Sequence, residues 1–158
     1  MAGPQWLDDD ELAAWEPLAA LMLLLVPRLD EATQPFGLTF FEYSALVVLE
    51  RAPDQQLPMK QLAAVASASL SRASHAAKRL EGRGLVERSA SPTDGRVTVV
   101  TLTAEGRDAL VRAAPSHVDA VRRTIIDVLS RDEVVQLGHL AERIGAGLNP
   151  DGAPPSRR

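Results

Sequence analysis

The stretch PMKQLAAVASASLSRASHAAKRLEGRGLVERSASPTDGRVTVVTL, residues 58–102, decides the fold. Pro58 suits the first turn of a short helix, because that position needs no backbone N–H. A polar break at residues 67–71 then offers several N-caps for a second helix that runs to about Arg83. Gly84 is expected to close this second helix in the left-handed conformation.

Two short strands follow the second helix. Residues 85–88 and 97–102 favour extended structure, and residues 91–95 between them (Ser-Pro-Thr-Asp-Gly) have the chemistry of a turn. This pattern predicts a β-hairpin. Two helices joined by a short turn and followed by a hairpin describe a winged helix-turn-helix, in which the second helix enters the major groove of DNA.

The segments that flank this stretch are predicted to be helical. Residues 8–34 begin with acidic side chains, which suit a helix N-terminus, and Pro17 and Pro27 are expected to kink or divide the helix. The run from Leu18 to Val26 is apolar nearly all round, so it requires burial on more than one side. A partner subunit is a natural second side.

Capping sequences place the remaining helices. Thr39 with Glu42 forms a capping box, Leu38 with Tyr43 fits a hydrophobic staple, and this helix runs to about residue 51. The other predicted helices span about 103–129, capped by Thr103 and kinked at Pro115, and 130–144, opened by a capping box of Ser130 and Glu133. Residues 145–158 are rich in Gly and Pro and are expected to be flexible.

Composition excludes several classes of function. The 158 residues include no cysteine, which removes disulfides, thiol nucleophiles, thiol redox sensing and Cys-based zinc sites. Aromatic residues make up 4%, so stacking on single-stranded nucleic acid is not expected. The acidic N-terminus does not fit an export signal, and the apolar run at 18–26 is too short to span a bilayer. A cytoplasmic protein without a membrane partner is expected.

The net charge of −4 argues at first against a nucleic-acid partner. Its distribution reverses that argument. Residues 60–96 hold 7 basic and 3 acidic side chains, a net charge of +4, which leaves −8 on the rest of the chain. The basic charge therefore lies on the predicted DNA-binding module.

The second helix of the module presents two different faces. Leu70, Ala73, Ala77 and Leu80 recur at helical spacing and form the predicted inner face. The opposite face and its surroundings carry groups that hydrogen-bond to bases or phosphates. The predicted DNA-binding residues, with those of the hairpin, are Lys60, Ser69, Ser71, Arg72, Ser74, His75, Lys78, Arg79, Thr93, Asp94, Gly95 and Arg96.

The individual roles differ. Arg72 suits a bidentate contact to guanine, and Arg96 at the hairpin tip suits a narrow minor groove. Asp94 is expected to hold Arg96 or a neighbouring arginine in position, since a carboxylate repels DNA. For Arg79 two roles remain open: a phosphate contact, or an ion pair with Asp94 or Glu81 that braces the hairpin.

The chain resembles the MarR family of transcriptional regulators over about residues 12–148. The resemblance is carried by Gly37-Leu-Thr39, Met59-Lys-Gln-Leu-Ala63, Arg79-Leu-Glu-Gly-Arg-Gly-Leu-Val-Glu-Arg88, Pro92-Thr-Asp-Gly-Arg96 and Leu102-Thr-Ala-Glu-Gly106. Each motif alone is short, but their order and spacing match the family. His75 and Gly95 stand where many members carry arginine, so weaker phosphate binding is expected.

The resemblance implies a mainly α fold with a small β-hairpin wing, a winged helix-turn-helix with N- and C-terminal dimerisation helices. The implied regions are an N-terminal dimerisation region (1–36), the DNA-binding module (37–102), C-terminal dimerisation helices (103–148) and a flexible tail (149–158). It implies a homodimer that binds double-stranded DNA at a palindromic operator, with half-sites about 10 bp apart. Members commonly repress genes and release DNA when a small, often aromatic or phenolic, effector binds between dimer region and module.

Other residues have simpler interpretations. Trp15, Phe36 and Tyr43 are candidates for an effector pocket, although packing in the core or an interface is the favoured explanation for each. His117 is expected to be an ordinary histidine on a helix surface. The histidines are scattered, so no metal site, cofactor or catalytic group is predicted, and an enzyme is not expected. The alternative to DNA binding is a winged-helix module that binds a protein.

Overall fold

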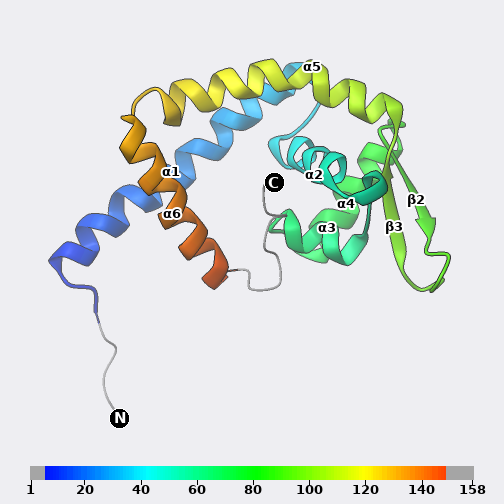
Figure 1. The fold of residues 1–158 in the computed structure, drawn as a ribbon, viewed down its shortest axis with the longest axis horizontal. Helices are drawn as coiled ribbons and strands as arrows, with labels where there is room; N and C mark the ends of the chain where they lie inside the picture. Colours follow the sequence, from blue (N-terminus) through cyan, green and yellow to red (C-terminus); the bar gives the residue numbers. More distant parts are fainter. Residues whose placement is uncertain (1–5, 149–158) are drawn as a thin grey trace, which may run out of the picture.

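The computed structural model describes residues 6–148. Two long helices, α1 (Asp9–Thr33) and α5 (Ala104–Val121), run along one side of the protein and lie against each other. A compact module lies below them in the view of Figure 1, and its hairpin projects at one end. The final helix, α6 (Arg131–Leu148), descends from the far end of α5.

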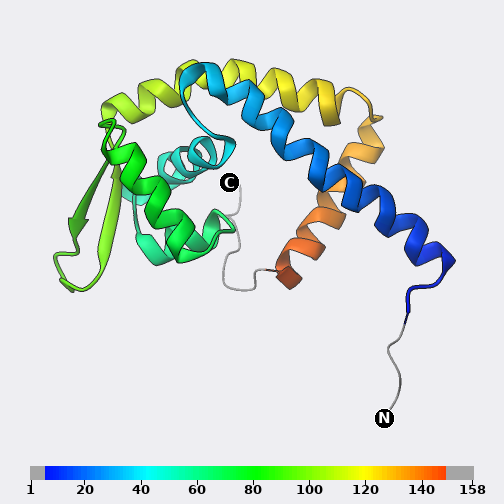
Figure 2. The same cartoon turned by 180° about the vertical axis from the view of Figure 1, so that it is seen from behind.

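The module has the predicted winged helix-turn-helix order. It comprises α2 (Phe40–Arg51), β1 (Gln56–Pro58), α3 (Met59–Val65), α4 (Leu70–Glu81), β2 (Val86–Ala90) and β3 (Thr98–Leu102). Single helical turns, η1 (Gln34–Phe36) and η2 (Pro53–Gln55), lie before and after α2. We call the β2–β3 hairpin with its loop (residues 86–102) the wing. Seen from behind, α4 lies beside the wing at the front of the module (Figure 2).

The sheet has three antiparallel strands in the order β1-β3-β2. Val86 lies opposite Leu102 in the hairpin, and Leu57 of β1 lies opposite Val100. The hairpin was predicted from its sequence. Strand β1 was missed because three residues that end in proline show no alternating pattern.

One hydrophobic core holds the module together. Leu46, Leu49, Leu80 and Val100 are at most 1% exposed, and helices α2, α3 and α4 and the sheet all contribute to the core. Helix α5 closes it with Ala109, Leu110 and Ala113. The N-terminal half of α5 therefore belongs to the core of the module, and the same helix packs against α1.

The helix starts predicted from the caps at Thr39, Thr103 and Ser130 are confirmed, whereas Pro58 ends β1 and precedes α3 instead of lying in its first turn. Glu42 and Thr39 form both hydrogen bonds of a capping box, and the Thr103 hydroxyl accepts from the Gly106 N–H. A second capping box joins Ser130 and Glu133, and the hydrogen bonds from Ser130 lower the pKa of the Glu133 carboxyl. Local hydrogen-bonding chemistry is sufficient to place these boundaries.

The prediction that proline would divide the first helix is wrong. Helix α1 continues through Pro17 and Pro27. Each proline removes one backbone hydrogen bond, and the residues that lose the partner, Ala13 and Leu23, are exposed on the helix surface. Water can therefore replace the lost donor, and the helix persists.

The C-terminal helices also differ from the prediction. Helix α5 ends at Val121, and the chain continues as a π-helical turn, η3 (Arg122–Ile126), before α6 begins. Helix α6 runs to Leu148, so residues 145–148 of the predicted flexible tail are helical. Residues 149–158 lie outside the described residues.

Two helices expose unusually large apolar surfaces. Only Leu29 and Thr33 are buried in α1, and no residue of α6 is buried. Leu23 and Leu24 are 78% and 68% exposed. By length and composition alone, the segment Asp9–Phe36 is apolar enough to cross a membrane, and it is longer than the apolar run at residues 18–26.

Candidate nucleic-acid interface

Helix α4 has one buried face. Ala73, Ala76, Ala77 and Leu80 are at most 2% exposed and pack into the core. Leu70 was predicted to belong to this face, but it is 55% exposed because it opens the helix, ahead of the first core position. The small alanine side chains let α4 lie close to its neighbours, and Gly84 follows the helix at φ +72° as predicted.

The opposite face of α4 is open to solvent. Ser71, His75 and Lys78 are exposed, and Ser74 is half-buried at its edge. Ser69 begins the helix and accepts a hydrogen bond from the Arg72 N–H, so its hydroxyl has a structural role as N-cap. Lys60 lies exposed on the neighbouring helix α3.

The wing tip is exposed from Pro92 to Arg96. The Asp94 carboxylate accepts a hydrogen bond from the Arg96 backbone N–H at 3.0 Å, and the side-chain hydroxyls of Ser91 and Thr93 lie within hydrogen-bonding distance, 3.0 Å apart. Asp94 thus shapes the loop through the backbone, and no ion pair within residues 6–148 includes the Arg96 guanidinium. That cation is free to bind an anion.

The ion pairs predicted for Arg79 are wrong. Arg79 Nε donates to Glu42 Oε1 of helix α2 at 2.8 Å, and Glu81 instead accepts from Arg88 of strand β2. The hydrogen bond from Arg88 lowers the pKa of the Glu81 carboxyl. Arg88 therefore braces the wing against α4, the role considered for Arg79.

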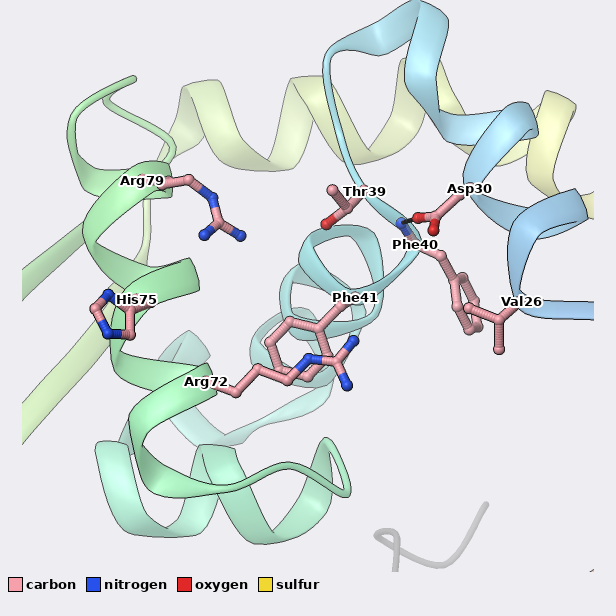
Figure 3. A pocket seen from close by; sticks show the side chains of 8 residues that line it. All are labelled: Val26, Asp30, Thr39, Phe40, Phe41, Arg72, His75 and Arg79. Carbon is pink, nitrogen blue, oxygen red and sulfur yellow. Dashed lines mark hydrogen bonds between the residues drawn. The ribbon is translucent and has the colours of Figure 1, made fainter. Parts of the chain in front are cut away.

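A cleft of about 340 Å³ separates α4 from the start of α2 and the end of α1. It is lined by Val26, Asp30, Thr39, Phe40, Phe41, Arg72, His75 and Arg79. Figure 3 shows Arg72 and Arg79 extending from α4 toward α2, with Arg72 beside the Phe41 ring. The Arg72 guanidinium lies 4.6 Å from the centroid of that ring, a cation–π contact.

The contacts of α1 and α2 in this cleft join residues that are distant in the sequence. Asp30 accepts a hydrogen bond from the Phe40 N–H and so joins the end of α1 to the start of α2. Glu42 is separated from Arg79 by 37 positions. No local pattern pairs residues at that separation, so only the folded chain shows the contact.

The three aromatic residues predicted for an effector pocket are not among the residues that line this cleft. Trp15 is 49% exposed on α1, Phe36 packs beside the core, and Tyr43 is 6% exposed within it. Burial raises the pKa of the Tyr43 hydroxyl. None of these residues lines the cleft between α1, α2 and α4.

His117 is not the surface histidine that was expected. Its ring lies between Tyr43 and Phe40, with centroids at 4.4 and 5.8 Å. Its Nδ1 atom is buried and has no hydrogen-bond partner among residues 6–148. Burial lowers the pKa of His117 below its ordinary value of 6.5, which favours the neutral ring.

Comparison with known proteins gives consistent matches. A model of the MarR family matches residues 36–97. The HTH-type transcriptional repressor Rv2887 of Mycobacterium tuberculosis is 32% identical over 123 residues, which cover 78% of this chain and 86% of that protein.

Solved structures extend the match to the whole fold. Sco3205, a MarR family transcriptional regulator from Streptomyces coelicolor solved in complex with DNA, is 37% identical, with a TM-score of 0.88 over 99% of both chains. CouR from Rhodococcus jostii, bound to p-coumaroyl-CoA, is 26% identical with a TM-score of 0.73, covering 90% of this chain and 96% of CouR. The chain therefore belongs to the MarR family of DNA-binding transcriptional regulators.

Proposed function

We propose that the protein is a homodimeric repressor that inserts α4 of each protomer into successive major grooves of a near-palindromic operator in the cytoplasm. The observation that carries this proposal is the exposed polar face of α4, with Ser71, His75 and Lys78, beside a wing tip whose Arg96 has no ion-pair partner within residues 6–148. The similarity to Sco3205, which was solved in complex with DNA, supports DNA binding by this fold.

Binding to the DNA upstream of the protein's own gene tests the proposal. Affinity should fall steeply as salt rises, because phosphate contacts release counterions. A reporter gene behind the same DNA should be silenced by the protein. Absence of binding at low salt, with the protein eluting unchanged on size exclusion in the presence of duplex, would favour a protein partner instead.

Two substitutions separate sequence recognition from phosphate binding. Arg72→Ala should reduce discrimination between operator and altered sites, since a bidentate contact to a base is worth about 1–3 kcal/mol. Arg96→Ala should weaken binding to all sequences similarly and lower the salt dependence. Equal discrimination by Arg72→Ala and wild type would remove Arg72 from the recognition set.

The homodimer is supported by the exposed apolar surfaces of α1 and α6. Leu23, Leu24 and Leu148 are each at least 68% exposed in the protomer. Soluble proteins rarely leave large apolar patches uncovered, and two copies that interlock these helices would cover them. This arrangement also explains how a segment with the composition of a membrane helix exists beside a DNA-binding module.

We place the effector site in the cleft between α1, α2 and α4. Phe40 and Phe41 offer apolar walls, and Arg72, which has no ion-pair partner within residues 6–148, offers positive charge. The chemistry therefore fits an aromatic molecule with an anionic group. The volume of about 340 Å³ is within the range of small-molecule sites. That CouR was solved with p-coumaroyl-CoA supports a ligand of this kind.

Thermal-shift screening of aromatic acids tests this site. A ligand that binds the cleft should raise the melting temperature of the wild type and release operator DNA in the same concentration range. Phe41→Ala should remove both effects. A ligand that keeps its affinity for Phe41→Ala would bind elsewhere.

A further inference from the structure

Three arginines of α4 and the turn after it point toward α2 or the turn before it. Arg72 and Arg79 are two helical turns apart on α4, and Arg83 lies in the turn that follows the helix. Each contacts the start of α2 or the turn before it: Arg72 the Phe41 ring, Arg79 Glu42, and Arg83 the turn at 36–37. These contacts therefore attach α4 to the junction between α1 and the module.

The Arg79 contact involves a carboxylate that needs its partner. The Glu42 side chain is 5% exposed, whereas the Arg79 side chain is 57% exposed. Glu42 Oε2 accepts from the Thr39 N–H, and Oε1 accepts from Arg79. A buried carboxylate that loses its cation is costly, so the fold favours the Arg79 orientation that points toward α2.

The Arg83 contact closes the turn between α1 and α2. Arg83 donates to the Gly37 carbonyl at 2.5 Å and to the Phe36 carbonyl at 3.5 Å. Gly37 has φ +71°, and a Cβ atom there would lie 3.0 Å from Arg83 Nη2. The glycine thus makes room for the guanidinium as well as for the turn.

We propose that Arg79 and Arg83 are positioning residues, which fix α4 against the α1–α2 junction and do not bind DNA phosphates. Because α1 belongs to the proposed dimer surface, these contacts set the distance and angle between the recognition helices of the two protomers. This inference rests on the proposed use of α4 as the recognition helix. It gives Arg79 a structural role through Glu42 of α2, and not through the hairpin partners expected from the sequence.

Salt dependence of operator binding separates the two roles of Arg79. A lost phosphate contact lowers the slope of log affinity against log salt by about 1. Arg79→Ala should weaken binding by about fivefold or more, a typical coupling between distant sites, and leave the slope unchanged. Lys78→Ala, a neighbouring exposed cation, is the control that should lower the slope.

Glu42→Gln should affect operator affinity differently under the two possible roles of Arg79. Glutamine can preserve the capping box but removes the negative partner of Arg79. If Arg79 positions α4, Glu42→Gln should weaken binding, and adding Arg79→Ala should weaken it little further. If Arg79 binds phosphate, Glu42→Gln should leave affinity equal or higher, and this result would overturn the proposal.

Alanine substitutions at two glycines form a matched pair that tests the contact made by Arg83. Gly37 and Gly84 have φ of +71° and +72°, so alanine introduces similar backbone strain at either position. Only at Gly37 does the new Cβ meet Arg83, because nothing lies within 4 Å of a Cβ at Gly84. Gly37→Ala should therefore weaken operator binding more than Gly84→Ala, with the salt slope unchanged in both. Equal losses would contradict the role of Arg83.

Hydrogen exchange of the DNA-free protein keeps this inference separate from the proposed function. Arg79→Ala and Arg83→Ala should speed amide exchange in α4 and in residues 36–42, and Lys78→Ala should not. This result can hold even if the wild type binds no DNA, in which case only the proposed function fails. Unchanged exchange in both arginine variants overturns the positioning role.

Discussion

At the scale of single residues, His117 makes stability depend on pH. Burial lowers its pKa in the folded protein below the ordinary 6.5, so the unfolded chain takes up the proton first. The contribution of the neutral ring is therefore complete above about pH 6.5 and is lost as the pH falls below that value.

The expected result is a melting temperature that falls between pH 7.5 and 5.5 in the wild type and falls less in His117→Phe. Phenylalanine keeps a ring between Tyr43 and Phe40 without a titrating nitrogen. His75→Asn, which changes an exposed histidine, should retain the wild-type dependence. An identical decline in all three proteins would locate the titration at another group.

Gly106 is a second residue with a measurable role. A Cβ there would lie 2.0 Å from the Leu85 carbonyl oxygen, whereas nothing lies within 4 Å of a Cβ at Gly138. Gly106→Ala should lower the free energy of unfolding by about 1–3 kcal/mol, as overpacking does. Gly138→Ala should raise it by about 0.5–1 kcal/mol, because alanine favours the helix. Chemical denaturation of both variants measures the difference.

At the scale of elements, helix α4 depends on its N-cap. The Ser69 hydroxyl accepts from the Arg72 N–H, and removal of such a cap costs about 1 kcal/mol. Ser69→Ala should therefore lower the free energy of unfolding by about that amount, and Ser71→Ala, on the exposed face, should change it little. Denaturation without DNA keeps this measurement independent of any contact that either hydroxyl makes to DNA.

Some of these elements could be predicted from the sequence, and others could not. Capping boxes at Thr39 and Ser130 involve residues three positions apart, so short motifs were sufficient. Strand β1 exists only because Gln56, Leu57 and Pro58 lie beside β3, a contact that their own sequence does not indicate. Persistence of α1 through Pro17 and Pro27 likewise depends on its surroundings.

The candidate site likewise contains residues that the sequence predicts and residues that it does not. The exposed face of α4 and the wing tip followed from helical spacing and turn chemistry. The partner of Arg79 did not, because Asp94 and Glu81 were the near acidic residues and Glu42 lies 37 positions away. His117 was misjudged for the same reason: its neighbours Phe40 and Tyr43 come from another helix.

At the scale of the whole molecule, assembly through α1 and α6 can be tested directly. Leu23→Lys places a charge in the centre of the proposed interface and should convert dimers to monomers on size exclusion with light scattering. Leu70→Lys alters an exposed leucine of α4 and should leave the mass unchanged. A dimer that survives Leu23→Lys would place the interface on another surface.

Loss of the dimer should also weaken operator binding far more than loss of one contact, because two linked half-sites bind with a high effective concentration. A monomer that retains wild-type affinity would mean that each module binds alone. Titration of Leu23→Lys against the full operator and against a single half-site measures this coupling.

Helix α6 has no buried residue in its own protomer, so the stability of the fold should depend on the concentration of the protein. When burial of a helix depends on a second copy, mass action raises the unfolding midpoint as protein concentration rises. A newly made chain at low copy number would then be the form most open to proteolysis, and accumulation would protect it. Silencing would set in once the cellular pool passes the dissociation constant of the dimer, so the response to expression level would be steeper than for a monomer.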